Sequence, residues 1–195
     1  MKVGITGGIG SGKTTVCKIF ETLGIPIYYA DDRAKQLMTE SEELKAQIIT
    51  NFGTKSYDKE GNLHRIHLAN IVFKDPDKLR LLNSLVHPVV YQDAERWHAA
   101  QRGAPYTIKE AALLFESGSF RQLDKIICVY SPKAARLQRV MQRDQADEAQ
   151  VLARMDKQMS DFDKMQLANF IITNNQEYSL IQQVLDIHQK ILTWT

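Results

Sequence analysis

Short apolar runs alternate with longer amphipathic stretches along this chain of 195 residues. Each of five runs has the length and composition of a buried β-strand. These runs cover residues 2–6, 25–29, 106–115, 124–130 and 169–173. Single strands that alternate with helices predict an α/β protein, in which a parallel five-stranded sheet is flanked by helices on both faces.

The first predicted helix shows this pattern clearly. Val16, Ile19, Phe20 and Leu23 lie at positions i, i+3, i+4 and i+7, which places them on one face of a helix. Gly24 follows and ends the helix as a C′ glycine. We expect this face to be buried against the sheet.

Residues 33–103 have helical spacing and little strand character. Pro76 follows the N-cap Asp75 and suits the first turn of a helix, whereas Pro88 predicts an interruption or kink. The region is too long for one crossover between parallel strands, so we expect a helical substrate-binding insertion. The rest of the single chain is expected to form a core at about 1–32, 104–130 and 166–195, with a helical lid at about 131–165.

The segment between the first strand and the first helix matches a phosphate-binding motif. Residues 7–14 read GGIGSGKT, a complete match to G-x-x-x-x-G-K-[ST], the loop of P-loop nucleotide-binding proteins. Its glycines let backbone N–H groups approach an anion, and the following helix N-terminus adds partial positive charge. Lys13 supplies a mobile cation for the β- and γ-phosphates, and the Thr14 hydroxyl is a ligand for Mg²⁺. The residues predicted to bind nucleotide are Gly8, Gly10, Ser11, Gly12, Lys13, Thr14 and Thr15.

Further site candidates follow the other strands, because an open parallel sheet binds its ligand at the carboxyl ends of its strands. They are Asp31, Asp32, Glu110 or Glu116, Ser131 and the residues after it, and Asn174. An acid after the second strand can orient an acceptor hydroxyl and take its proton. Alternatively, one of the two aspartates caps a helix that starts near Arg33, and both interpretations can hold together. Residues 111–116 fit a strand ending in a metal-binding acid, Glu116, and equally a strand followed by a helix.

Three arginines, Arg136, Arg139 and Arg143, stand at i, i+3 and i+7, within roughly 60° of one helix face. One interpretation is a lid that brings guanidinium groups onto the transferred phosphoryl group and excludes water. The other is a solvated basic face. Because phosphoryl transfer needs cations beyond Lys13, the glycine loop favours the lid.

Composition narrows the functional classes. The formal net charge is +2, too small to indicate nucleic acid as a bulk partner. Cys17 and Cys128 lie in apolar stretches outside any C-x-x-C motif, which indicates packing roles in a reducing compartment. The glycine loop begins before a signal peptide could form, and no apolar run approaches 18 residues. We therefore expect a cytoplasmic protein with no membrane-spanning segment.

Taken in order, these elements resemble the dephospho-CoA kinase family. The resemblance begins with the glycine loop, preceded by Thr6, and continues with Ala30-Asp31 after the second strand. The other matching segments are 61–65 (GNLHR), 72–73 (VF), 82–88 (LNSLVHP), 113–116 (LLFE), 136–144 (RLQRVMQRD), 154–158 (RMDKQ) and 168–174 (ANFIITN). The glycine loop alone occurs in many families, whereas the order of these elements, over about residues 2–175, is specific to this one.

The resemblance implies ATP-dependent phosphorylation of the ribose 3′-hydroxyl of dephospho-CoA, which gives CoA and ADP in the last step of CoA biosynthesis. It implies ATP as phosphoryl donor, Mg²⁺ as metal and dephospho-CoA as small-molecule partner. The implied roles are Lys13 on the phosphates, Thr14 on Mg²⁺, Asp31 as base at the acceptor, Arg143 with Arg139 or Arg136 as charge neutralisers, and Arg65 and His87 as acceptor contacts.

Two positions depart from the family pattern. Tyr29 stands where the family usually has the first acid of Asp-Ala-Asp, so the catalytic base is expected at Asp31, with Asp32 as the alternative. Ala112 stands where the family usually has proline before Leu-Leu-Phe-Glu, which alters only the exit from the strand.

Three other functions compete with this interpretation. A P-loop kinase of another small hydroxylated acceptor, such as a nucleoside monophosphate, is the alternative enzyme. A GTPase-like switch, or a nucleotide-sensing module that binds partners, is the second. Residues 58–61 match its D-x-x-G element, but no apolar strand precedes them and no N-K-x-D element occurs, so we interpret them as a turn. A nucleic-acid kinase is the third, and the modest net charge disfavours it.

Overall fold

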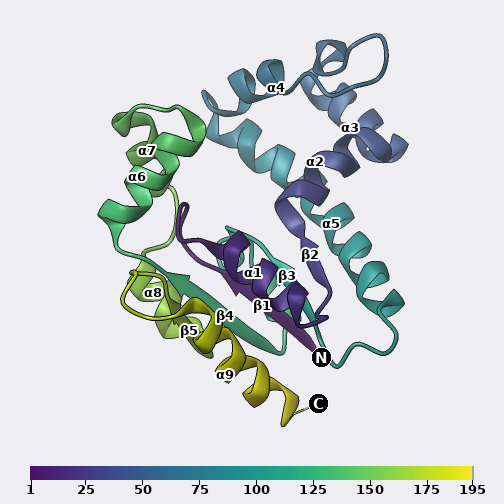
Figure 1. Cartoon of the computed structure of the whole chain (residues 1–195). Helices are drawn as coiled ribbons and strands as arrows, with labels where there is room; N and C mark the ends of the chain where they lie inside the picture. The colour runs from purple at the N-terminus through teal and green to yellow at the C-terminus, as the bar shows by residue number, and fades with distance from the viewer. Residues whose placement is uncertain (195) are drawn as a thin grey trace. The chain divides into compact units, whose positions relative to one another are not determined.

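The computed structural model describes residues 1–194 and divides the chain into two compact units. The first unit combines residues 1–29 with the chain from residue 98 onward, and the second consists of residues 30–97. Figure 1 labels the helices and strands of both units. No helix within residues 1–194 has both the length and the apolar character that crossing a bilayer requires.

The first unit is built on one parallel sheet with the strand order β2-β3-β1-β4-β5. The strands are β1 (Lys2–Thr6), β2 (Ile27–Tyr29), β3 (Thr107–Glu110), β4 (Lys125–Tyr130) and β5 (Phe170–Thr173). The central strand is β1, in which Gly4 lies opposite Lys109 on one side and Ile126 on the other. The predicted five-stranded parallel sheet is therefore confirmed.

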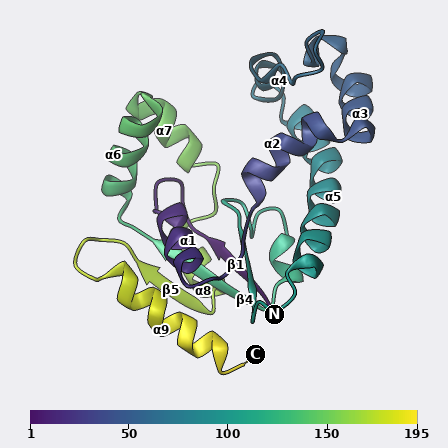
Figure 2. The ribbon, with the colours of Figure 1, turned by 45° about the vertical axis from the view of Figure 1, so that its right-hand side comes forward.

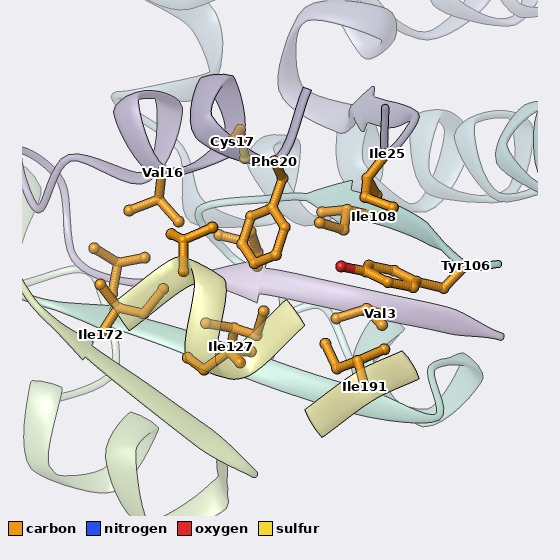
Figure 3. Packing of buried hydrophobic residues seen from close by; sticks show 14 residues of the cluster. Val3, Val16, Cys17, Phe20, Ile25, Tyr106, Ile108, Ile127, Ile172 and Ile191 are labelled. Carbon is orange, nitrogen blue, oxygen red and sulfur yellow. The ribbon is translucent and has the colours of Figure 1, made fainter. Parts of the chain in front are cut away.

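Two helices, α1 (Lys13–Thr22) and α9 (Leu180–Leu192), cover one face of this sheet. In Figure 3, Phe20 of α1 and Ile191 of α9 point toward the strands. Both belong to a buried cluster with Val3, Ile108 and Ile127. The apolar face predicted for the first helix is thus buried against the sheet, as its spacing required.

The opposite face carries different elements. There α8 (Asp161–Leu167) packs against β4. Leu114 and Leu123, from the segment between β3 and β4, lie so close to Gly4 that a Cβ there would approach their methyl carbons to 2.8 and 2.6 Å. This segment also contains the short helix η2 (Ser119–Gln122). Helices and loops therefore enclose the sheet from both sides, as expected for a doubly covered parallel sheet.

The predicted strand 106–115 is wrong at its end, because β3 stops at Glu110 and residues 111–118 form turns. Glu110 is the last residue of β3 that has a register partner on either side, Ile5 in β1 and Tyr29 in β2. Both neighbouring strands end there or one residue later, so a longer β3 would have no ladder to join. The apolar side chains of Leu114 and Phe115 are buried nevertheless.

After β4 the chain forms α6 (Lys133–Asp144) and α7 (Glu148–Met155), which pack side by side in Figures 1 and 2. Val140, Val151 and Met155 form a small buried cluster between them. Ile9, at the tip of the glycine loop, packs against this cluster. The helical character predicted for 131–165 is confirmed, and the segment touches the loop that was predicted to bind phosphate.

The regular elements of the second unit are helices. Its elements are α2 (Ala30–Glu40), α3 (Glu42–Phe52), η1 (Thr54–Ser56), α4 (Arg65–Val72) and most of α5 (Pro76–Ala100). Arg33 of α2 forms an ion pair with Asp93 of α5 at 2.8 Å, and the Tyr57 hydroxyl donates to the Met38 carbonyl at 2.6 Å. Asp58 accepts hydrogen bonds in a tight turn that ends at Asn62, which confirms the turn predicted there.

Of the interruption or kink predicted at Pro88, the interruption is absent, because α5 runs unbroken from Pro76 to Ala100. Proline cannot donate to the carbonyl four residues earlier, which belongs to Ser84. Ser84 and Pro88 are both exposed, so water can satisfy that carbonyl. The start of the helix is as predicted, since the Asp75 carboxylate accepts from the backbone N–H groups of Asp77 and Lys78.

Candidate nucleotide site

The glycine loop joins β1 to α1, which is the context that the motif requires. Gly12 is the N-cap of α1 and has φ +95°, a left-handed conformation that favours glycine. A Cβ at Gly12 would also lie 2.3 Å from Nδ2 of Asn174, which donates to the Ser11 carbonyl at 2.8 Å. Asn174, a predicted candidate at the end of β5, therefore supports the loop through its hydrogen bond to Ser11. The first turn of α1 then presents backbone N–H groups that have no partner within the helix.

Lys13 lies at the base of this loop and is buried. Its Nζ donates to the Gly7 carbonyl at 3.0 Å and lies 4.0 Å from Oε1 of Glu110. The two side chains are 10% and 9% exposed, so their attraction is weakly screened. Of the two strand-end acids left open by the sequence, Glu110 is the one beside Lys13.

Glu116 has a different environment. Its Oε1 lies 3.0 Å from the Nζ of Lys164 and accepts from the backbone N–H of Met159 at 2.9 Å. Burial acts to raise the pKa of Glu116, but hydrogen bonds from the backbone and the Lys164 ammonium outweigh it and hold that pKa below its usual value. The carboxylate is thus committed to a structural ion pair between α8 and the segment after β3.

The hydroxyl groups of the loop suit a phosphate and a metal. Ser11 is buried, and its Oγ has no hydrogen-bond partner within the described residues. Thr14 and Thr15 are exposed in the first turn of α1. Hydroxyl and phosphate oxygens are ligands that Mg²⁺ accepts, so the residues present fit a magnesium–nucleotide complex. Residues 1–194 contain no cluster of three or more His, Cys, Asp or Glu side chains able to hold a metal by themselves.

The three arginines of α6 lie in three different environments. Arg136 is buried and donates to the carbonyls of Ser131 and Ile9 at 3.1 and 3.3 Å, and it also pairs with Asp161. Arg139 donates to the Gly10 carbonyl at 3.3 Å and to the Ser131 hydroxyl at 2.9 Å. The first two arginines are thus directed to the glycine loop.

Arg143, in contrast, is 61% exposed. It donates twice to Asp144, at 2.6 and 3.1 Å, and Arg154 donates to the same carboxylate at 2.7 Å. Hydrogen bonds from Arg143, then from Arg154, hold the pKa of Asp144 well below its usual range. The role predicted for Arg143 in phosphoryl transfer stays a prediction.

The aspartates after β2 belong to the second unit. Asp31 and Asp32 both lie in the first turn of α2, which begins at Ala30, directly after β2 ends. The alternative in which one of them caps a helix near Arg33 is therefore wrong, although carboxylates in a first turn do stabilise a helix. Asp32 forms an ion pair with Lys35 at 2.7 Å. The assignment of the base to Asp31 stays a prediction.

The predicted acceptor contacts also lie in the second unit. Arg65 is the first residue of α4, and His87 lies within α5, and both are exposed. The roles predicted for Arg65 and His87 in binding the acceptor stay predictions.

Sequence reasoning missed two residues that contact or support the loop. Gln158 and Asp161 precede and begin α8, and their side chains bond to Ile9 and Arg136. Arg136 itself was considered only as a charge neutraliser. No local pattern marks Gln158 or Asp161, because their partners lie far away in sequence.

Comparison with known proteins places the chain in a family. The family model described as dephospho-CoA kinase matches residues 1–179. A dephospho-CoA kinase of Salinibacter ruber is 39% identical over 175 residues, which cover 89% of this chain and 88% of that protein.

Two solved structures also resemble the chain closely. The dephospho-CoA kinase of Campylobacter jejuni is 30% identical, with a TM-score of 0.72 and coverage of 99% of this chain and 98% of that one. A protein of Thermus thermophilus is also 30% identical, with a TM-score of 0.86 and coverage of 97% and 96%. The chain therefore belongs to the dephospho-CoA kinase family.

Proposed function

We propose that this protein transfers the γ-phosphoryl group of ATP to the ribose 3′-hydroxyl of dephospho-CoA, giving CoA and ADP in the last step of CoA biosynthesis. Membership of the family over residues 1–179 carries this proposal. The glycine loop supports it independently, because a buried lysine, an unpartnered serine hydroxyl and a helix N-terminus converge there.

ATP, the phosphoryl donor, would be bound by the first unit. Backbone N–H groups of the loop and of the first turn of α1 would bind the phosphates, and Lys13 would lie against the β- and γ-phosphates. Glu110 keeps the Lys13 ammonium at the base of the loop through charge attraction. Thr14 would be a ligand of Mg²⁺, which when bound would neutralise charge on the phosphate oxygens.

The acceptor hydroxyl needs a base and the departing ADP needs no proton. Asp31 would accept the proton of the 3′-hydroxyl. The 3′-oxygen of the ribose would then bond to the γ-phosphorus of ATP, while the bond between that phosphorus and the β,γ-bridging oxygen breaks. Arg139, which already reaches the Gly10 carbonyl, and Arg143 would neutralise charge that develops on the phosphoryl oxygens. Arg65 and His87 would contact the acceptor.

Cytoplasmic localisation stays a prediction.

A coupled assay that measures ADP release tests the proposal across acceptors. We expect turnover with dephospho-CoA and little with nucleoside monophosphates at the same concentration. Turnover with a nucleoside monophosphate and none with dephospho-CoA would favour the alternative kinase instead. Tight binding of GTP without phosphorylation of any acceptor would favour a nucleotide switch.

The Asp31→Asn variant tests the base. We expect kcat to fall about 100-fold or more, while KM for ATP changes only a few-fold, because the base acts only in the transfer step. The matched control is Asp32→Asn, which removes an exposed carboxylate one residue away. If Asp32→Asn loses activity and Asp31→Asn keeps it, the base is Asp32.

A further inference from the structure

Ile9, at the tip of the glycine loop, is held on three sides by the segment 131–165. Its backbone N–H donates to Oε1 of Gln158 at 2.8 Å. Its carbonyl accepts from Nη1 of Arg136 at 3.3 Å. Its side chain packs against the apolar cluster between α6 and α7. Both backbone groups and the side chain of one loop residue are therefore fixed by a segment more than 120 residues away in sequence.

The guanidinium group of Arg136 also has partners outside the loop. Only 5% of the residue is exposed. Its Nε donates to the Ser131 carbonyl at 3.1 Å, and its Nη2 pairs with Asp161 at the start of α8. Each of the three guanidinium nitrogens thus donates to an acceptor within the protein. The Asp161 carboxylate also compensates the positive charge, which leaves little net charge for a phosphate.

The guanidinium lies directly against the loop backbone. A Cβ at Gly8 would lie 2.1 Å from Nη1 of Arg136 and 2.9 Å from Oδ1 of Asp161, closer than non-bonded atoms approach. A side chain at residue 8 would therefore have to displace this buried ion pair, even before any nucleotide is considered.

We propose that Arg136, together with Asp161 and Gln158, is a positioning residue that holds the glycine loop in its phosphate-binding shape, and that Arg136 does not neutralise the transferred phosphoryl group. This assignment separates it from Arg139 and Arg143, which share its helix. It also links loop shape to the position of the segment 131–165. The kinetic part of the test rests on the proposed function, whereas the exchange part does not.

Hydrogen exchange of the protein without nucleotide is the first test. We expect the amides of Ile9 and Ser11 to exchange about tenfold faster in Arg136→Gln and in Gln158→Leu, because the loop then opens more often. Arg143→Gln should leave these two amides unchanged, and so should Arg80→Gln, whose arginine is 72% exposed in the second unit. Exchange rates like those of the wild type in Arg136→Gln would overturn the proposal.

Arg136→Lys is the second test, because lysine keeps the charge but cannot make three directed hydrogen bonds. A positioning role predicts that KM for ATP rises about tenfold in Arg136→Lys, with a smaller effect on kcat. A residue that acts through charge alone would tolerate lysine. Wild-type kinetics in Arg136→Lys would therefore overturn the proposal. If dephospho-CoA is not a substrate, the exchange result still decides it.

Two further variants guard against loss of folding. Arg136→Met combined with Asp161→Leu removes both charges, so no buried charge is left unpaired. We expect this double variant to fold, and we expect the amides of Ile9 and Ser11 still to exchange about tenfold faster than in the wild type. Gly8→Ala, whose methyl group would have to displace the buried ion pair, should also speed the exchange of these two amides. Slow exchange in the folded double variant would count against the proposal.

Discussion

Glu110 is the residue whose importance the structure raises most. In sequence it is one of several acids that follow predicted strands. In the fold its carboxylate lies 4.0 Å from the Lys13 ammonium, and both groups are nearly buried. Burial first, and then the Glu110 charge, raises the pKa of the Cys17 thiol, so that thiol stays neutral and packs as an apolar side chain.

At the residue scale, we predict that Glu110→Gln lowers kcat/KM for ATP about 10- to 100-fold, because Lys13 loses the charge that holds it at the loop. Steady-state kinetics with varied ATP measures this effect, and circular dichroism checks the fold. Glu148→Gln, at an exposed position of α7, is the control and should keep wild-type kinetics. A Glu110→Gln enzyme with unchanged kcat/KM would show that Lys13 is positioned without Glu110.

At the scale of elements, a buried ion pair joins α8 to the segment after β3. Lys164 is fully buried, with its Nζ 3.0 Å from Glu116 and 3.4 Å from the Ala112 carbonyl. We predict that Glu116→Gln lowers the free energy of unfolding by about 3 kcal/mol, because it leaves a buried ammonium uncompensated. Urea unfolding measures this change.

The double variant Glu116→Gln/Lys164→Met provides the check. It removes the buried charge together with its partner, so we expect it to be more stable than Glu116→Gln alone. If the two variants are equally unstable, the cost comes from packing and not from the unpaired charge.

The burial of His188, at a second contact between elements, makes stability depend on pH. The Tyr106 hydroxyl and Nδ1 of His188 lie 2.6 Å apart, joining the start of β3 to α9. Burial lowers the pKa of His188 below its usual 6.5. The unfolded chain therefore binds a proton more readily than the folded one, so stability is lost as the pH falls below about 6.5.

We predict that His188→Gln is less sensitive than the wild type to a change from pH 7.5 to pH 5.5 in urea unfolding. Tyr106→Phe should keep most of the wild-type dependence, because burial and not the hydroxyl lowers the pKa of His188. An equally steep dependence in His188→Gln would assign the effect to other groups.

At the scale of the whole molecule, the nucleotide site draws on residues from across the first unit. The loop, Glu110, α6, Gln158 and Asn174 come together only when the sheet has formed. A ligand that binds this folded arrangement and not the unfolded chain must stabilise the fold.

We predict that a non-hydrolysable ATP analogue with Mg²⁺ at 100 times its Kd raises the free energy of unfolding by about 2.7 kcal/mol. Thermal unfolding at a series of analogue concentrations measures this dependence. Lys13→Ala should give a much smaller shift at the same concentration. A wild-type melting temperature that is insensitive to millimolar analogue would contradict nucleotide binding at the loop.

Much of this protein follows from local sequence. Alternating runs determine the five strands, and helical spacing determines the buried face of α1. The glycine motif predicts where phosphate binds. These features depend on neighbours within about seven residues, so periodicity and turn chemistry reveal them. Predictions failed where long-range context decides. The end of β3 depends on where β1 and β2 stop, and α5 continues through Pro88 because that face is exposed.

The partners of the site were decided by tertiary structure. Sequence spacing placed Arg136, Arg139 and Arg143 on one helix face, but the environment of that face varies along the helix. Burial beside Asp161 makes Arg136 a support of the loop, whereas solvent and Asp144 surround Arg143. Likewise, only the pairing of β3 with β1 brings Glu110 to Lys13. A side chain's residue type limits its chemistry, but its charge state and partners depend on groups that folding brings in from distant parts of the chain.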